Sequence, residues 1–204
     1  MAARRAVFVA VIGMLVSSAG VGTSPAVGSD FMVTGALTSQ PIGHYEFCKA
    51  NPGECSILPR DRGPTVLNDA MAEKITSINL AVNEAVKPLS DREIYGKEEV
   101  WTYPVNGIGD CEDYVLEKRR RLQAEGVPLS NLLITVVRKA DGEGHAVLTV
   151  RTDHGDFILD NLSDEMKLWS GTGYRYLKRQ ASNNTGRWVS LRDESNLLVS
   201  AVRK

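Results

Sequence analysis

Apolar residues recur at helical spacing between residues 64 and 88. They return every three or four positions, which places them on one face of an amphipathic helix; they are Leu67, Met71, Ile75, Ile78, Val82 and Val86. Pro88 marks the end of this helix, because proline has no backbone N–H to continue the hydrogen-bond ladder. Residues 30–63 are rich in glycine, proline and turn-forming residues, and we expect irregular structure there.

A second helix is predicted from Cys111 to about Ala124. Asp110 directly before it is a favourable N-cap residue. Gly126 and Pro128 follow its expected end, where these two residue types commonly stop a helix.

The pattern becomes typical of β-structure after residue 130. Residues 131–138, 144–151 and 156–160 are rich in branched apolar side chains and predict three strands. Two later runs, residues 174–178 and 187–191, predict a hairpin because turn-forming residues separate them; these are Asn183, Asn184, Thr185 and Gly186. Helices that precede antiparallel strands indicate an α+β fold, with N-terminal helices packed on an antiparallel sheet.

The N-terminus has the pattern of a secretory signal peptide. Arg4 and Arg5 precede an apolar run over residues 6–16, and small residues follow at 17–20. We therefore expect residues 1–28 to be a signal peptide, although the pattern does not fix the cleavage point, and residues 29–204 to form a single domain in the periplasm or outside the cell. A membrane anchor is the alternative, but no apolar run reaches the roughly 18–20 residues of a spanning helix.

Composition and charge exclude several classes of protein. Hydrophobic residues make up 43% and charged residues 24% of the 204 residues. This is ordinary for a globular chain and argues against a disordered, collagen-like or coiled-coil protein. Lys and Arg number 24 against 25 Asp and Glu, so the net charge of −1 gives no basic excess for binding nucleic acid.

Three cysteines must be explained in an exported protein. Cys48 and Cys55 flank a turn-rich hexapeptide and favour a disulfide that closes a small loop; two unpaired or buried thiols are the alternative. Cys111 is then left over. A free thiol in an oxidising compartment is a liability unless it is buried or reactive.

Three residues offer the groups of a cysteine hydrolase. Cys111 stands at a helix N-terminus, where the helix dipole favours a thiolate. His145 opens one predicted strand and Asp160 closes the next. A histidine can take the thiol proton and a carboxylate can orient the imidazole, so this order of residues predicts a Cys-His-Asp triad.

Each of these residues also has an ordinary structural explanation. Cys111 could be a small buried hydrophobic residue, His145 a strand residue bonded to backbone, and Asp160 a turn former. His44, in a loop-like segment, and His154, in a turn, are weaker catalytic candidates.

Strand register tests the triad prediction. A four-residue loop over residues 151–154 pairs Val150 with Gly155 and sets His145 directly opposite Asp160. A two-residue turn at residues 154–155 instead sets Thr149 opposite Asp160 and leaves His145 four residues away. We therefore expect the longer loop.

Four segments resemble the bacterial transglutaminase-like cysteine proteinases. They are Trp101-Thr102-Tyr103-Pro104, Gly-Asp-Cys-Glu-Asp-Tyr at 109–114, Gly-His-Ala-Val-Leu at 144–148 and Ile-Leu-Asp-Asn at 158–161. The resemblance implies a papain/transglutaminase-like fold and carries the family's triad onto Cys111, His145 and Asp160. It also implies an exported endopeptidase with a protein substrate, the N-terminal linker of a surface adhesin in biofilm formation, and a membrane-bound regulator as a partner.

The resemblance further implies a calcium site beside the nucleophile. It carries over most directly onto Asp110 and Glu112, and less directly onto Asp113. The charges support this, because three acids around Cys111 raise the thiol pKa and a bound cation offsets them. Hard oxygen ligands favour Ca²⁺, which takes about 6–8 of them, so further ligands must exist. Three solvated acids at a helix start are the alternative.

The sequence therefore predicts a calcium-dependent cysteine endopeptidase. The Cys111 backbone N–H is the expected oxyanion donor. A second donor is not assigned, although Trp101 and Asn106 are nearby in sequence. Two alternatives remain: a transglutaminase-like acyl transferase, and a non-enzymatic calcium-dependent binding protein.

Overall fold

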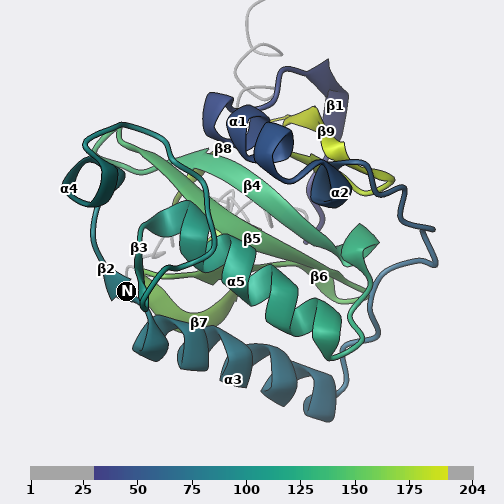
Figure 1. Cartoon of the computed structure of the whole chain (residues 1–204). Helices are drawn as coiled ribbons and strands as arrows, with labels where there is room; N and C mark the ends of the chain where they lie inside the picture. Colours follow the sequence, from purple (N-terminus) through teal and green to yellow (C-terminus); the bar gives the residue numbers. More distant parts are fainter. Residues whose placement is uncertain (1–29, 193–204) are drawn as a thin grey trace, which may run out of the picture.

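The computed structural model describes residues 30–192, so the predicted signal peptide lies outside the described residues. Its centre is a seven-stranded antiparallel sheet in the order β1-β9-β8-β4-β5-β6-β7 (Figure 1). The strands are β1 (Thr34–Thr38), β4 (Leu132–Arg138), β5 (Gly144–Thr152), β6 (Gly155–Asp160), β7 (Ser163–Leu168), β8 (Arg175–Ala181) and β9 (Asn184–Leu191).

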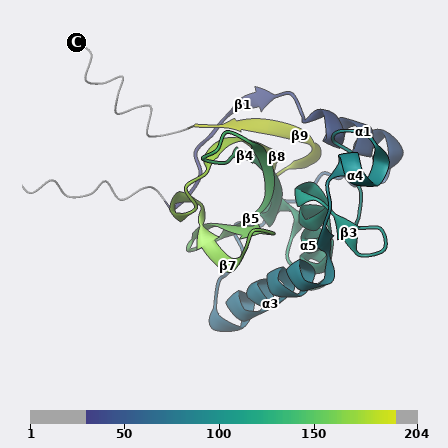
Figure 2. The same ribbon diagram turned by 90° about the vertical axis from the view of Figure 1, so that its left-hand side faces the viewer.

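Helices cover one face of this sheet. α3 (Asp69–Ala85) and α5 (Cys111–Ala124) lie side by side across it, and Figure 2 shows how strongly the sheet curves between β9 and β7. The shorter elements are α1 (Ile42–Ala50), α2 (Pro52–Cys55), α4 (Asp91–Tyr95) and the 3₁₀ turns η1 (Leu129–Asn131) and η2 (Trp169–Gly171). The predicted α+β class is confirmed. Within residues 30–192, no helix is both long and apolar enough to cross a bilayer.

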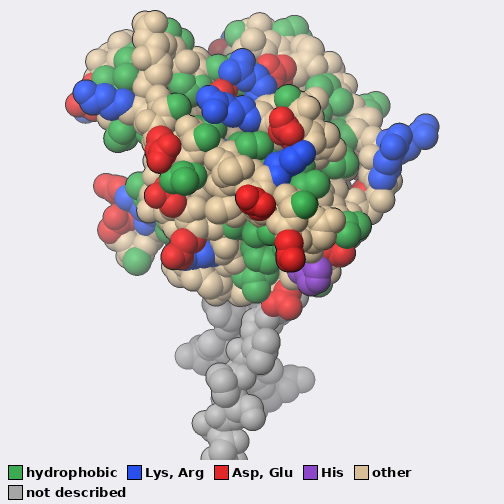
Figure 3. All heavy atoms as spheres, turned by 90° about the horizontal axis from the view of Figure 1, so that it is seen from below, with side chains coloured by type: hydrophobic (Ala, Val, Ile, Leu, Met, Phe, Trp, Pro, Cys, Tyr) green, Lys and Arg blue, Asp and Glu red, His purple; other side chains and the backbone are tan. Residues whose placement is uncertain are grey.

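The main core lies between the helices and the sheet. Leu116 and Leu122 of α5 and Ile75 of α3 pack with the alternate strand residues Ile134, Leu148 and Leu159. The intervening strand residues Val137, Val147 and Ile158 point to the other face and form a second cluster with Met32 and Tyr176. This alternation is the period of two expected for strands buried on both faces. On the face drawn in Figure 3, acidic and basic side chains are interspersed among apolar ones.

Helix α5 has the bounds that the sequence predicts. The Asp110 backbone oxygen accepts from the N–H groups of Asp113 (3.1 Å) and Tyr114 (3.2 Å), which begins the helix. Its side chain makes no capping bond and instead accepts from the Asp91 N–H at 3.2 Å. Asp110 therefore occupies the N-cap position while its carboxylate faces another segment.

Three expectations about local structure are wrong. Residues 30–63 contain β1, α1 and α2 rather than irregular structure alone. The helix expected from residue 64 begins at Asp69, with Asn68 as its cap. In the C-terminal hairpin, Ala181 pairs with Asn184, so the turn is Ser182-Asn183 and residues 184–186 belong to β9.

A short parallel pairing positions the loop before α5. β2 (Lys87–Pro88) pairs with β3 (Ile108–Gly109), and the Leu89 N–H donates to the Gly109 oxygen at 3.1 Å. The start of α4 therefore lies beside the start of α5, although about twenty residues separate them in the chain.

A disulfide joins α1 to α2. Cys48 and Cys55 are bonded, with their Cα atoms 5.5 Å apart, and Cys111 is the free cysteine of the described residues. This is the pairing that the spacing predicts.

We expect one alkylatable thiol in the oxidised protein and three after reduction, counted by intact mass. The Cys48→Ser/Cys55→Ser variant should lose about 2–3 kcal/mol of unfolding free energy, because the cross-link restricts the unfolded chain. Three reactive thiols before reduction would contradict the disulfide, but not the role of Cys111.

Candidate active site

The Cys111 thiol lies at the first position of α5, where backbone N–H groups are not used by the helix. Its Sγ donates to Glu112 Oε2 at 3.1 Å and accepts from the Ala146 N–H at 3.4 Å. Ala146 is the residue of β5 that follows His145. The hydrogen bond from its N–H therefore holds the Cys111 sulfur close to the start of β5.

His145 and Asp160 are directly bonded. His145 Nε2 lies 2.8 Å from Asp160 Oδ1, and both side chains are buried. Because Nε2 is occupied in this way, Nδ1 is the ring nitrogen that remains for the thiol. Among the hydrogen bonds of the described residues, none joins His145 to Cys111.

The loop that brings the pair together differs from both registers considered above. Thr152 pairs with Gly155 and Leu148 with Leu159, so the turn is the two residues Asp153 and His154. Continued by one residue, this register sets Val147 opposite Asp160. His145 is two residues from Val147 on the same strand, so its side chain lies on the same face of the sheet as that of Asp160. The two residues are diagonal neighbours, within reach of a long side chain. The expected four-residue loop is wrong, yet the contact forms.

Three donors converge on the Asp160 carboxylate. Besides His145, the Leu162 N–H donates to Oδ1 at 3.0 Å and the Tyr174 hydroxyl donates to Oδ2 at 2.6 Å. Burial raises the pKa of Asp160, but these hydrogen bonds and the charge of His145 outweigh it, so the pKa lies below its ordinary value. Asp160 is therefore an ionised carboxylate with both oxygens bonded.

Cys111 and His145 line one pocket. Its volume is about 310 Å³, and Trp101, Ile42 and Lys178 contribute to its walls. A neighbouring hollow of about 480 Å³ shares Ile42, Glu99 and Trp101 with it and continues along α1. The hollow surface thus extends well beyond the thiol.

The surroundings of Cys111 favour the neutral thiol. Burial, the negative charge of Glu112 and the bond to Glu112 raise the pKa of Cys111, and the Ala146 N–H opposes them. That neighbouring acids raise the pKa of this thiol is also what the sequence predicts.

Three carboxylates meet near Cys111. Asp91, Asp110 and Asp113 each bring one oxygen within 4.8 Å of the others, and Asp91 and Asp113 are buried. Asp91 Oδ1 and Asp110 Oδ1 have no hydrogen-bond partner among the described residues. The second oxygens accept from backbone: Asp91 Oδ2 from Val100 and Asp110 Oδ2 from Asp91.

Asp113 completes this acidic trio. Its Oδ1 accepts from the Thr102 N–H at 2.9 Å. Its side chain packs on Gly109, where an added Cβ would lie 2.6 Å from Asp113 Oδ2, so a glycine is needed there. Burial and the charges of Asp110 and Asp91 raise the pKa of Asp113 to about 7, even though the Thr102 N–H lowers it. Two of the three acids are buried, and Asp91 and Asp110 each have an oxygen without a hydrogen-bond partner among the described residues, an arrangement that suits a cation.

Glu112 is placed differently from the other two acids that the sequence singled out. Its carboxylate bonds to the Cys111 thiol, and it is not one of the three acids whose oxygens meet. Burial and the charge of Asp110 raise its pKa to about 9.

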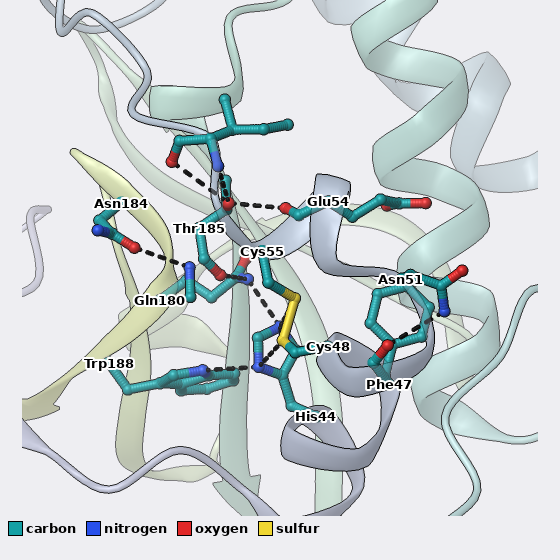
Figure 4. The surroundings of a disulfide bond; sticks show 12 residues. His44, Phe47, Cys48, Asn51, Glu54, Cys55, Gln180, Asn184, Thr185 and Trp188 are labelled. Atoms are coloured by element: carbon teal, nitrogen blue, oxygen red, sulfur yellow. Dashed lines mark hydrogen bonds between the residues drawn. A yellow bond between two sulfur atoms is a disulfide. The ribbon is translucent and has the colours of Figure 1, made fainter.

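The two weaker histidine candidates lie in other surroundings. His44 is buried beside the disulfide, where its Nδ1 accepts from Trp188 Nε1 at 3.2 Å and its Nε2 is 3.2 Å from Gln180 Nε2 (Figure 4). Burial, and to a lesser extent Arg119, lowers the pKa of His44 to about 4. His154 lies in the β5–β6 turn, exposed, and pairs with Asp153 at 3.1 Å. His44 is therefore a core residue and His154 a surface residue.

Sequence reasoning missed Asp91 and Tyr174. The β2–β3 pairing positions Asp91 near Asp110. Each of these strands has only two residues, so the sequence contains no periodic pattern that would predict the pairing. It also missed Asn83 of α3, whose amide donates to the Asp160 backbone oxygen at 3.0 Å. An asparagine on a helix face gives no hint of this contact.

Comparison with known proteins assigns the family. The model of the bacterial transglutaminase-like cysteine proteinases matches residues 34–196. A solved structure of Legionella pneumophila LapG is similar, with 26% identity and a TM-score of 0.50, over 62% of this chain and 72% of that one. Calcium-bound Legionella pneumophila LapG has the same fold, with 23% identity and a TM-score of 0.51, over 65% and 81%. A search of curated proteins gives no match.

The matched segment is most of the chain and includes every site residue described above. The chain therefore belongs to the bacterial transglutaminase-like cysteine proteinases and is a cysteine peptidase.

Proposed function

We propose that this cysteine peptidase is an exported, calcium-dependent endopeptidase whose catalytic residues are Cys111, His145 and Asp160. Residues 1–28 are its signal peptide, and residues 29–204 act as one domain in the periplasm or outside the cell. Its substrate is a protein of the cell envelope or surface, and the family resemblance favours the N-terminal linker of a surface adhesin, with a membrane-bound regulator.

One observation carries the catalytic assignment. Cys111 and His145 line the same pocket, and the Nε2 atom of His145 is hydrogen-bonded to the ionised, buried carboxylate of Asp160. An ordinary strand histidine bonded to backbone would not need this partner. A buried structural cysteine would not line a pocket of this size.

The chemistry follows from these positions. His145 Nδ1 takes the Cys111 proton, and the sulfur attacks the peptide carbonyl carbon while the Cys111 backbone N–H stabilises the oxyanion. The C–N bond then breaks, His145 protonates the leaving amine, and a thioester remains. A water molecule gives a proton to His145 and attacks the thioester, which releases the acid and restores the thiol. Asp160 holds the imidazole and stabilises its cationic form.

The acidic trio supports a calcium site. The oxygens left without partners on Asp91 and Asp110 suit a hard cation, and Asp113 provides a third carboxylate. Glu112, which the sequence also proposes as a ligand, is next to this group. Asp91, Asp110 and Asp113 would hold the cation, which would supply positive charge next to the segment that carries Cys111.

Incubation with exported proteins of the same cell tests the proposed activity. We expect new termini, found by mass spectrometry, and no loss of cleavage when an amine acceptor is added. Transfer of the acyl group to the amine would instead indicate a transglutaminase-like enzyme. A protein that binds calcium without cleaving any candidate would indicate a binding protein.

Calcium removal should abolish cleavage. We expect activity to disappear after exhaustive EGTA treatment and to return with Ca²⁺, while Mg²⁺ restores it poorly because it demands a smaller, octahedral shell. Asp110→Asn and Asp91→Asn should each weaken calcium binding at least about tenfold, measured by calorimetry, since affinity follows the number of charged ligands.

Glu98→Gln is the matched control for Asp91→Asn. Glu98 lies in the same segment, but its side chain is 74% exposed and pairs with Arg92. The calcium affinity of the Glu98→Gln variant should change far less than that of Asp91→Asn, because Glu98 acts on Asp91 through its charge alone. Full activity of the verified metal-free protein would remove calcium from the mechanism.

A further inference from the structure

We propose that Tyr174 is a positioning residue of the active site, which fixes Asp160 through its hydroxyl and His145 through its ring. This inference rests on the proposed role of the triad. It assigns a task to a residue outside the four segments that resemble the family.

The hydroxyl contact is short and specific. Tyr174 donates to Asp160 Oδ2 at 2.6 Å, which is the oxygen that His145 and Leu162 do not use. Hydrogen bonds to a charged partner are shorter and stronger than neutral ones. The carboxylate is therefore held at both oxygens and cannot rotate about its Cβ–Cγ bond without losing a donor.

The ring contact restrains the imidazole. The Tyr174 and His145 rings meet edge to face, with centroids 5.7 Å apart and planes at 65°. One side chain thus touches both members of the hydrogen-bonded pair. Because His145 must present Nδ1 to Cys111, a restraint on its ring plane affects the reacting geometry directly.

The chain around Tyr174 is itself anchored. Its backbone N–H donates to Thr172 Oγ1 at 3.4 Å, and the Thr172 hydroxyl also bonds Trp169 and Tyr176. Gly173 has a φ of +74°, which a glycine adopts without strain. The turn after η2 therefore sets the direction from which Tyr174 enters the site.

Lys118 also interacts electrostatically with this carboxylate. It is fully buried on α5, two turns after Cys111. Burial lowers the pKa of Lys118 to about 7, although the charges of Asp160 and Asp164 oppose this shift. Tyr174 differs from Lys118 because its contact with Asp160 is a direct hydrogen bond.

The test compares Tyr174→Phe with Tyr174→Ala and a matched control. Tyr174→Phe removes one hydrogen bond and keeps the ring, so kcat should fall about 3- to 10-fold with KM unchanged. Tyr174→Ala also removes the ring contact and should lower kcat further. The control, Tyr176→Phe, deletes a hydroxyl on the adjoining strand that bonds Thr172 rather than Asp160, and should leave kcat unchanged.

Proton NMR gives a readout that does not depend on turnover. The proton between His145 Nε2 and Asp160 should shift downfield in Tyr174→Phe, because the carboxylate then has one donor fewer and bonds His145 more strongly. In Tyr174→Ala it should broaden, since the ring is no longer restrained. Tyr176→Phe should not move it.

The outcomes separate this proposal from the proposed function. An unchanged resonance and unchanged kcat in Tyr174→Phe would overturn the role of Tyr174. An equal change in Tyr176→Phe would also overturn it, because the effect would then come from loss of the turn. A shifted resonance in a protein that cleaves nothing would retain the positioning role and reject the endopeptidase.

Discussion

Cys111→Ala is expected to abolish peptide cleavage while the protein stays folded. Loss of a catalytic nucleophile commonly costs about 10⁶-fold in kcat, so any measured rate should be background. The fold should tolerate the change, because the side chain is partly exposed to the pocket and its bonds are to Glu112 and the Ala146 N–H. Thermal unfolding with calcium present checks the fold, and the appearance of new substrate termini checks activity.

The disulfide provides the control for this prediction. Cys48→Ser/Cys55→Ser removes the two other cysteine sulfurs and should keep activity at temperatures where the protein is folded. Retention by Cys111→Ala of more than about a hundredth of wild-type activity would reject Cys111 as the nucleophile.

The parts of the fold that were predicted correctly have local signals. Helix α5 has the predicted bounds: Asp110 occupies the N-cap position, although its side chain makes no capping bond, and Gly126 and Pro128 follow the helix. The three strands β4 to β6 are runs of branched apolar residues, and burial on both faces explains why they do not alternate.

The elements that were missed depend on distant partners. β7 has the sequence Ser-Asp-Glu-Met-Lys-Leu, too polar for a strand pattern, and forms because it pairs with β6. β1 is mostly exposed and pairs with β9, which lies about 150 residues later. Edge strands of this kind carry little apolar signal of their own.

The same distinction applies to the site. Cys111, His145 and Asp160 could be proposed from the sequence because each stands at or near the end of an element that has a local signal. Asp91 and Tyr174 approach through tertiary contacts, one across the β2–β3 pairing and one from the turn after η2. The strand register failed because turn chemistry alone did not locate the two-residue turn, although the parity of the strand still put His145 on the correct face.

Variants of the other two residues of the proposed triad should also cause large losses of activity. His145→Ala removes the general base, and kcat/KM should fall at least about 10³-fold. Iodoacetamide should label Cys111 more slowly in this variant near neutral pH, because the imidazole no longer accepts the thiol proton. His154→Ala is the matched control: this histidine is exposed in the β5–β6 turn, and its removal should change neither rate.

Asp160→Asn should lower kcat/KM by about 10²- to 10⁴-fold. The hydrogen bonds around residue 160 determine the cause of this loss. All three partners of the carboxylate are donors: His145 and Leu162 meet Oδ1, and Tyr174 meets Oδ2. An asparagine therefore keeps its oxygen toward His145 and Leu162 and turns its amide toward Tyr174, whose hydroxyl can also accept. The histidine tautomer is then preserved, which differs from the usual consequence of this substitution.

The remaining loss comes from the missing negative charge, which no longer stabilises the imidazolium. Asp160→Asn combined with Tyr174→Phe tests this account, because the amide then loses its acceptor and can face His145 with the wrong tautomer. The double variant should be slower than the two separate losses multiplied together, a coupling expected between residues in one network. Simple multiplication of the two effects would show that Tyr174 does not set the orientation of residue 160, and unchanged cleavage in Asp160→Asn would remove Asp160 from the mechanism.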